Sequence, residues 1–277
     1  MRVNDHATAR APRARSAAKS DSKSVDGPKE PSRGADRSVL QSVQRAASVM
    51  EEVSRRGGSA TITDLATALK LDRTIVYRLV RTLEGENLLE SQNGRYRIGS
   101  RALMLGNSYL EDLQVVRASV PFQVGLLDRL LKGRPWTTHL LLPIGYEMAL
   151  VDSVWNTSAP LEMQLSMGRR FPMTTTAAGH SILAYWDREE VVKAIGEKAA
   201  AELEPILEAV REAGGLGFAR DYIPGASAIG AAIFDRSGRP AAVLLLAGLE
   251  LEAELTPTSP VAMTIKRTAN AISQSLR

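Results

Sequence analysis

The pattern of apolar residues predicts that ordered structure begins at Ser38 with three helices. Apolar side chains recur at helical spacing over residues 39–53, and a short second helix follows with Thr63 as its expected N-cap. Asp72 is a favourable N-cap for a third helix over residues 73–84. Short turns separate these helices, so the segment is typical of a compact helical domain.

The next segment predicts a hairpin and a further helix. Residues 88–90 and 95–98 are typical of short strands, and Asn93-Gly94 between them favours a tight hairpin turn. Three helices and a hairpin together predict a winged helix-turn-helix domain over residues 37–99. Residues 100–116 predict a linker helix, whose apolar side chains need a partner such as the same helix of a second subunit.

The remaining residues, 117–277, alternate between strand and helix patterns. Strands are predicted at residues 137–142, 148–154, 161–167, 217–219, 228–234 and 241–246. Helices are predicted around residues 126–133, 176–186, 189–197, 204–213 and 258–276. Strands in groups, with helices at the ends, predict an α+β fold with an antiparallel sheet.

Charge is distributed unevenly along the chain. Residues 1–36 contain almost no large apolar side chains and are therefore predicted to form a disordered basic tail. Residues 1–37 carry nine Lys or Arg against five Asp or Glu, whereas residues 118–277 carry fifteen against seventeen. This asymmetry fits a polyanionic partner at the N-terminal end, although an ordinary solvated tail would give the same counts.

The composition also excludes several classes of protein. The chain has no cysteine, which excludes disulfides and thiolate chemistry, and its three histidines argue against a histidine-rich metal site. It has no apolar run long enough to span a membrane, and its N-terminus lacks the apolar stretch of a signal peptide. We therefore expect a cytoplasmic protein with no metal and no cofactor.

The third predicted helix has one polar and one apolar face. At 100° per residue its apolar side chains share one side, while two arginines, a tyrosine and a threonine share the other. Arginine can bind guanine in the major groove, and Tyr and Thr can donate to phosphates. The expected DNA-binding residues, including one flanking arginine and two on the hairpin, are Arg73, Thr74, Tyr77, Arg78, Arg81, Arg95 and Arg97. A merely solvated amphipathic helix is the alternative, and the order of helix, turn, capped helix and basic hairpin argues against it.

Several segments resemble one family. The runs SVLQSVQRA (38–46), LKLDRTIVYRL (69–79) and GRYRIG (94–99) resemble the DNA-binding domain of IclR-type regulators. The resemblance continues through MGRRFPM (167–173), TAAG (176–179), IGAAIFD (229–235) and GRPAA (238–242). It implies a repressor or activator that binds double-stranded DNA as a dimer, often assembling into tetramers. It also implies a C-terminal domain with a GAF- or profilin-like fold that binds a metabolite.

The resemblance implies an effector-binding pocket in the C-terminal domain. Matching the family pattern places ligand-facing backbone amides at Ala177 and Ala178 and an acidic residue at Asp221. Three positions that carry polar side chains in some relatives that bind hydrophilic acids are apolar here, namely Ala228, Leu245 and Ala247. We therefore expect an aromatic or mostly apolar effector rather than a small 2-oxo acid. Trp155 could supply an aromatic wall or simply fill the core.

Features that could indicate catalysis are weak. The run GASAIG (225–230) lacks the spacing of a nucleophile elbow, and the adjacent residues His180 and Ser181 cannot face each other on a helix. Arg169 and Arg170 precede a helix start at Thr176, which would suit a carboxylate ligand as well as simple helix capping. An effector-controlled transcription regulator with an inverted-repeat operator is the preferred hypothesis. A DNA-targeted enzyme and an oligomerising DNA-binding module without a ligand are the alternatives.

Overall fold

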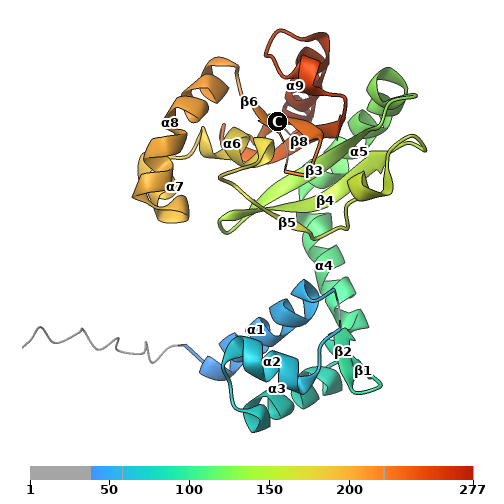
Figure 1. Cartoon of the computed structure of the whole chain (residues 1–277), viewed down its shortest axis with the longest axis vertical. Helices are drawn as coiled ribbons and strands as arrows, with labels where there is room; N and C mark the ends of the chain where they lie inside the picture. The colour runs from blue at the N-terminus through green and yellow to red at the C-terminus, as the bar shows by residue number, and fades with distance from the viewer. Residues whose placement is uncertain (1–38, 58, 221, 277) are drawn as a thin grey trace, which may run out of the picture.

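The computed structural model describes residues 39–57, 59–220 and 222–276, which form two lobes joined by a helical segment (Figure 1). The predicted basic tail, Ser38 and Asp221 lie outside the described residues. The N-terminal lobe contains α1 (Gln41–Arg55), α2 (Ile62–Leu69), α3 (Arg73–Gly85), β1 (Leu89–Gln92) and β2 (Arg95–Ile98). This is the predicted order of three helices and a hairpin.

Side-chain caps define where the helices of this lobe begin. Asp72 Oδ1 accepts a hydrogen bond from Thr74 N at 2.7 Å, which confirms the predicted start of α3. The predicted cap of α2 is wrong, because Thr61 rather than Thr63 occupies that position. Thr61 Oγ1 accepts from Asp64 N at 3.2 Å, and Asp64 Oδ2 accepts from Thr61 N at 2.9 Å. Only Thr61 has an acidic residue three positions later that can complete this capping box.

The hairpin turns at Asn93 and Gly94, where φ is 53° and 73°. Two successive positive φ values match the tight turn that favours these two residue types. Tyr96 on β2 also exchanges backbone hydrogen bonds with Ala60, at 3.0 and 2.8 Å, and this bridge ties the hairpin to the segment before α2. The hairpin is therefore held firmly against the helices rather than extending freely.

Two consecutive helices connect the lobes. α4 (Ser100–Asp112) and α5 (Gln114–Leu126) meet at Leu113, whose ψ of 97° breaks the helical path, and a π-helical turn, η1 (Leu127–Leu131), follows α5. The linker helix predicted over 100–116 therefore ends earlier than expected. None of the described residues of α4 is buried.

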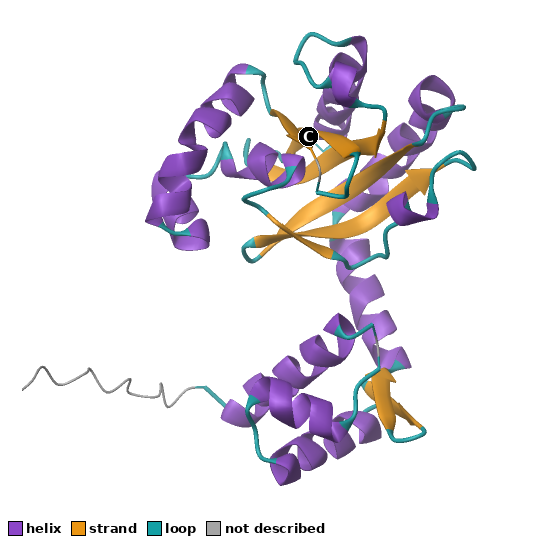
Figure 2. Cartoon of the chain, in the orientation of Figure 1, coloured by secondary structure: helices purple, strands orange, loops and turns teal. Residues whose placement is uncertain are grey.

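The C-terminal lobe is built on a six-stranded sheet in which all neighbours are antiparallel, as predicted (Figure 2). The strand order is β5-β4-β3-β8-β7-β6. Their bounds are β3 (Trp136–Ile144), β4 (Glu147–Trp155), β5 (Arg170–Pro172), β6 (Leu216–Arg220), β7 (Ala226–Phe234) and β8 (Pro240–Leu249).

The strand predicted at 161–167 is wrong. Met163 N bonds to Pro160 O at 3.0 Å and closes a 3-10 turn, η2 (Leu161–Met163), and the short strand β5 follows later. The alternating apolar residues suggested a strand with one buried face. Met163 is buried against Ala226 and Ala247 but Leu161 is 79% exposed, because this segment packs over β7 and β8 instead of pairing within the sheet.

Helices cover both faces of the sheet. α6 (Ala177–Leu183), α7 (Arg188–Ile195) and α8 (Glu197–Glu212) pack on one face around Leu141, Leu150 and Val243. α5, η1 and α9 (Pro260–Ser275) pack on the other face, and a further 3-10 turn, η3 (Glu252–Glu254), precedes α9. None of the helices in the described part of the chain has the length and apolar character needed to cross a membrane.

Two paired glycines bring α6 unusually close to the sheet. Gly217 on β6 and Gly230 on β7 are register partners. A Cβ atom at Gly217 would lie 2.5 Å from Ala177 O, and one at Gly230 would lie 3.0 Å from the same oxygen. Side chains at these positions would push the first turn of α6 outward. The glycines therefore fix the start of α6 directly over the strands.

Candidate functional site

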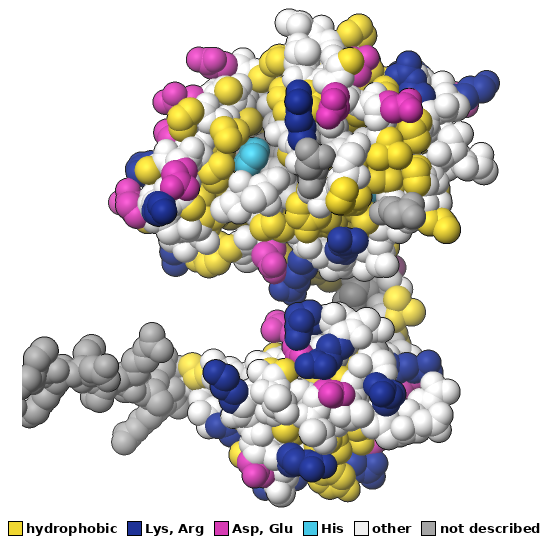
Figure 3. All heavy atoms as spheres, in the orientation of Figure 1, with side chains coloured by type: hydrophobic (Ala, Val, Ile, Leu, Met, Phe, Trp, Pro, Cys, Tyr) yellow, Lys and Arg dark blue, Asp and Glu magenta, His cyan; other side chains and the backbone are white. Residues whose placement is uncertain are grey.

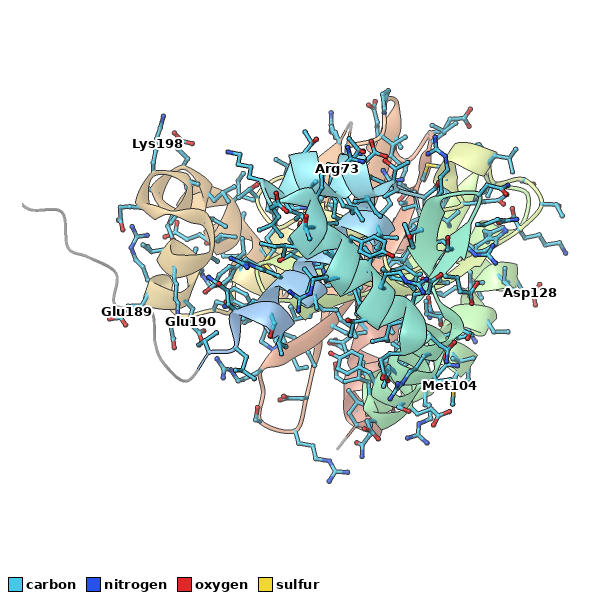
Figure 4. The ribbon with its side chains drawn as sticks, turned by 90° about the horizontal axis from the view of Figure 1, so that it is seen from below. Arg73, Met104, Asp128, Glu189, Glu190 and Lys198 are labelled. Carbon is cyan, nitrogen blue, oxygen red and sulfur yellow. The ribbon has the colours of Figure 1, made fainter. Side chains whose placement is uncertain are left out.

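The exposed face of α3 presents the predicted polar residues. Thr74, Tyr77 and Arg78 are exposed, whereas the apolar residues of the opposite face pack into the N-terminal core. Arg73, labelled in Figure 4, begins the helix. Arg73 and Arg78 have no carboxylate within ion-pair distance among the described residues, but Arg81 Nη1 lies 2.6 Å from Glu84 Oε2. The arginines of α3 therefore differ in their availability to an external anion.

The hairpin adds two more exposed arginines beside α3. Arg95 and Arg97 lie on one side of β2, with the buried ring of Tyr96 on the other. Arg97 is held by Glu90, whereas Arg95 has no ion pair within the described ranges. Lys70, which the sequence reasoning missed, is exposed in a left-handed conformation (φ 53°) just before α3. Lys and Arg side chains are spread over the visible surface of this lobe (Figure 3).

A largely apolar cavity lies between the start of α6 and the sheet, with about 590 Å³ of empty space including its mouth. Five of the predicted effector-binding residues line it, namely Ala177, Ala178, Ala228, Leu245 and Ala247. Trp155 does not, which corrects the suggestion that it forms an aromatic wall. It is the last residue of β4 and its side chain is 40% exposed. The aromatic wall consists of Phe171 and Tyr222 instead, whose ring centroids are 5.4 Å apart.

The cavity also contains a buried histidine that sequence reasoning missed. His139 Nδ1 lies 2.8 Å from Ser153 Oγ, and His139 Nε2 lies 2.8 Å from Thr137 Oγ1. Thr137 Oγ1 donates to Ala247 O at 3.2 Å, so it accepts from Nε2–H and leaves Nδ1 to accept from Ser153. Burial lowers the pKa of His139 to about 4, which keeps the ring neutral at pH 7. The available signal was a run of three polar residues, Thr137, Thr138 and His139, at the start of a strand whose next three residues are leucines.

The first turn of α6, which lines the same cavity, contains backbone donors without partners among the described residues. Thr176 Oγ1 caps the helix by accepting from Gly179 N at 3.1 Å. The amides of Ala177 and Ala178 have no hydrogen-bond acceptor among the described residues, although both residues are only 1% exposed. Buried donors without partners are unfavourable. An acceptor group on a molecule in the cavity would satisfy them.

The two arginines before this helix have different surroundings. The guanidinium carbon of Arg169 lies 5.5 Å from the ring centroid of Phe171, at the aromatic wall of the cavity. Arg170 pairs with Glu147 at 3.2 Å. The guanidinium of Arg169 is therefore the one next to the cavity wall.

Residues considered for catalysis point away from each other. His180 Nε2 donates to Thr174 O at 2.9 Å, whereas Ser181 Oγ donates to Ala177 O at 2.9 Å. The expectation that they do not form a nucleophile–base pair is confirmed. Within the described ranges, no three or more His, Asp or Glu side chains are grouped so that they could hold a metal ion.

Comparison with protein families gives two matches that together cover most of the chain. Residues 42–93 match the family model described as the IclR helix-turn-helix domain. Residues 107–274 match the model of the bacterial transcriptional regulator IclR C-terminal domain. The chain belongs to the IclR family. It is therefore a DNA-binding transcription regulator, as the sequence motifs predicted, and members of this family act as regulators rather than as enzymes.

Relatives and solved structures agree with this assignment. The chain is 26% identical over 251 residues to the transcriptional repressor AllR of Klebsiella pneumoniae, covering 85% of this chain and 90% of that protein. An IclR regulator from Alicyclobacillus acidocaldarius superposes with a TM-score of 0.71 at 21% identity, covering 86% of this chain and all of the other. A homologue from Microbacterium hydrocarbonoxydans, solved with 4-hydroxybenzoate, superposes with a TM-score of 0.68 at 20% identity, covering 85% of this chain and 99% of the other. These superpositions show that this IclR regulator has the fold predicted from its sequence.

Proposed function

We propose that this IclR regulator is a repressor whose affinity for an inverted-repeat operator is controlled by a small, mostly apolar acid bound in the α6 cavity. The decisive observation is the combination of apolar walls with the unpaired amides of Ala177 and Ala178. Such a pocket favours a ligand with an apolar body and one hydrogen-bond-accepting end. The name of the AllR relative supports repression.

An aromatic ring is the best fit to the cavity walls. Phe171 and Tyr222 form the aromatic side, and Arg169 next to Phe171 adds a positive charge. The homologue solved with 4-hydroxybenzoate binds a ligand of this kind. The side chains of Ala228, Leu245 and Ala247 offer no polar group to a small hydrophilic acid.

For DNA recognition we propose that α3 enters the major groove and that the hairpin contacts the adjacent backbone. Arg78, Tyr77 and Thr74 are the groups on the exposed face, with Arg73 at its start. Arg81 and Arg97 contact DNA only if they release or share Glu84 and Glu90. We further propose that the regulator works in the cytoplasm, where the chromosome lies.

For assembly we propose a homodimer formed through the linker helix, with further association into a tetramer. Leu103, Met104, Leu105 and Tyr109 on α4 are between 52% and 69% exposed. Figure 4 shows Met104 projecting away from the rest of the chain. A helix with so much exposed apolar surface needs cover, and two copies of it would also place two winged helices on two half-sites. Accordingly, we assign residues 37–99 to DNA binding, 100–116 to the linker and 117–277 to effector binding.

The enzyme hypothesis has less support. His139 and Ser153 form a hydrogen-bonded pair, but a pKa of about 4 makes His139 a weak base at neutral pH. Both ring nitrogens are already engaged by hydroxyls, and the third member is Thr137 rather than a carboxylate. This arrangement is suited to holding a neutral ring in place beside a ligand.

A thermal-shift and gel-mobility experiment tests the proposed effector. We expect 4-hydroxybenzoate or benzoate to raise the melting temperature through binding to the folded state, and to change operator affinity. Ala178→Leu should abolish both responses by filling the cavity, while Trp155→Phe, outside the cavity, should retain them. Stabilisation by glyoxylate or pyruvate alone would show that the assignment to apolar acids is wrong.

A further inference from the structure

A chain of hydrogen bonds crosses the sheet beneath the cavity. On the cavity face, Ser153 Oγ bonds to His139 Nδ1 at 2.8 Å. On the opposite face, the neighbouring carboxylate of Asp152 accepts from Gln123 Nε2 of α5 at 2.7 Å, and its other oxygen accepts from Ser153 N at 2.8 Å. The strand β4 thus links a cavity residue on one face to a helix on the other.

The chain continues along α5 to the junction with the linker helix. Gln123 Nε2 also lies 3.4 Å from Ser119 Oγ, which donates to Val116 O at 2.8 Å. Val116 N in turn bonds to Leu113 O at 3.0 Å, at the residue where α4 and α5 meet. Ser119 and Gln123 are fully buried. The chain therefore runs through the protein interior from the cavity to the break between the two helices.

Backbone geometry places the two neighbouring residues on opposite faces. Ser153 pairs with His139 and Asp152 pairs with Leu140, after which the register shifts so that Leu141 pairs with Leu150. This irregularity leaves Val151 as an extra residue on β4. Such bulges re-aim side chains and are frequent next to functional sites.

One polar atom in this series of hydrogen bonds, Gln123 Oε1, has no hydrogen-bond partner among the described residues. Both N–H bonds of the Gln123 amide are used, by Asp152 and Ser119, but Gln123 Oε1 is buried with no donor among the described residues. A buried carbonyl without a donor raises the energy of this arrangement relative to others. The contact between α5 and β4 therefore contains an unsatisfied group, and Leu113 is the break between α5 and α4.

We propose that Gln123 couples occupancy of the cavity to the position of the linker helix through Asp152 and Ser153. The proposal rests on the proposed function of the cavity as an effector site. A molecule that displaces His139 also displaces Ser153, and this changes the contact by which Asp152 holds α5. Because α5 is joined to α4 at Leu113, a shift of α5 would move α4. The distance between the two winged helix-turn-helix domains of a dimer would then change.

Hydrogen exchange in the full-length protein tests this coupling without a known effector. Ala178→Leu acts as a permanent occupant of the cavity. We expect it to change the exchange rates of the amides over residues 110–119 about threefold or more. In a Gln123→Met background the same substitution should leave those rates unchanged. Gln274→Met, a matched change at an exposed position of α9, should preserve the response.

Two further variants guard against an effect of misfolding. Ser153→Ala interrupts the chain at its cavity end and should abolish the response as Gln123→Met does. Ser153→Thr keeps the hydroxyl that bonds to His139 Nδ1 and should retain the response. A response that persists in both Gln123→Met and Ser153→Ala would overturn the coupling. If 4-hydroxybenzoate still releases DNA from those variants, the proposed function stands and only the coupling fails.

Discussion

Arg97 and Glu90 face each other across the β1–β2 hairpin, the wing of the winged helix-turn-helix. Arg97 Nη2 lies 3.0 Å and Nε 3.1 Å from Glu90 Oε2. Arg95, two residues earlier on the same side of β2, has no such partner in the part of the chain that the structure describes. An arginine without a carboxylate can bind a phosphate at once, whereas a paired one must first give up or share its partner. The two wing arginines should therefore contribute differently to DNA binding.

We expect Arg95→Ala to weaken binding to the operator and to random duplex by the same factor. It should also lower the salt slope of the binding constant by about 1, because one phosphate contact is lost. Arg97→Ala should have a smaller effect. Fluorescence anisotropy over a range of salt concentrations measures both. Equal slopes for the two variants would show that Glu90 releases Arg97 when DNA binds.

Arg78 should contribute to sequence reading rather than to general affinity. It lies on the exposed face of α3 without a carboxylate partner among the described residues. Arg78→Ala should cost roughly 1–3 kcal/mol on the operator and less on random DNA. Arg81→Ala is the control, because Glu84 already holds that side chain at 2.6 Å. Equal losses of binding free energy on the operator and on random DNA would show that Arg78 contacts phosphates rather than bases.

Local signals in the sequence were sufficient for most of the DNA-binding lobe. Asp72 and the Asn93-Gly94 turn act within a few residues, so their effect could be predicted directly. The cap at Thr61 differs from the predicted Thr63 because a capping box depends on a pair of residues, Thr61 and Asp64, rather than on one threonine. The alternation at 161–167 predicts a strand, but alternation alone cannot distinguish a paired strand from a loop that buries one side chain on the sheet.

The cavity depended on contacts that the sequence does not encode locally. The resemblance placed alanines such as Ala178 on its walls, because motif positions carry over between related chains. His139 and Ser153 meet only through the pairing of β3 with β4, and a bulge sets that register. Trp155 was misplaced because the position of a residue along its strand decides whether it reaches the cavity. Tertiary pairing, rather than residue type, determined these outcomes.

Gly217 should be difficult to replace. A Cβ atom there would lie 2.5 Å from Ala177 O and 2.7 Å from Ser181 Oγ, so the start of α6 would have to move. We expect Gly217→Ala to destabilise the C-terminal lobe by about 1–3 kcal/mol and to weaken binding in the cavity. Urea unfolding followed by tryptophan fluorescence reports on this lobe, because all three tryptophans lie in it.

Gly125→Ala provides the matched control for that experiment. Gly125 lies within α5, and a Cβ atom there would meet nothing within 4 Å. Replacing a helical glycine in open space by alanine should stabilise the protein by up to about 1 kcal/mol. Similar losses from both substitutions would show that close approach of α6 is not the cause.

His139 should make the C-terminal lobe less stable in mild acid. Its folded pKa of about 4 lies below the ordinary value of 6.5, so the unfolded chain binds more protons between these two values. The contribution of neutral His139 to the free energy of unfolding is complete above pH 6.5. It is lost as the pH falls toward 4, and the free energy of unfolding decreases by ~3 kcal/mol in all. Urea unfolding at several pH values measures the loss.

His139→Gln isolates this contribution from other acid-sensitive groups. Asp64, Asp72 and Asp235 also have lowered pKa values because they accept hydrogen bonds, and they respond to acid in both proteins. The difference in stability between wild type and His139→Gln should therefore shrink as the pH falls from 6.5 to 4. A difference that stays constant with pH would show that His139 does not resist protonation.

The linker helix should carry the dimer contact. Leu105 and Tyr109 are one turn apart on α4, are 59% and 52% exposed, and have no cover within the chain's described residues. Leu105→Glu would place a charge in the interface and should weaken dimerisation at least about tenfold, or 1.4 kcal/mol. Asn107→Glu, an exposed polar position on the opposite side of the same helix from Leu105, should change it little. Light scattering across a concentration series measures the difference, and a wild-type protein that is monomeric both free and on DNA would refute the interface.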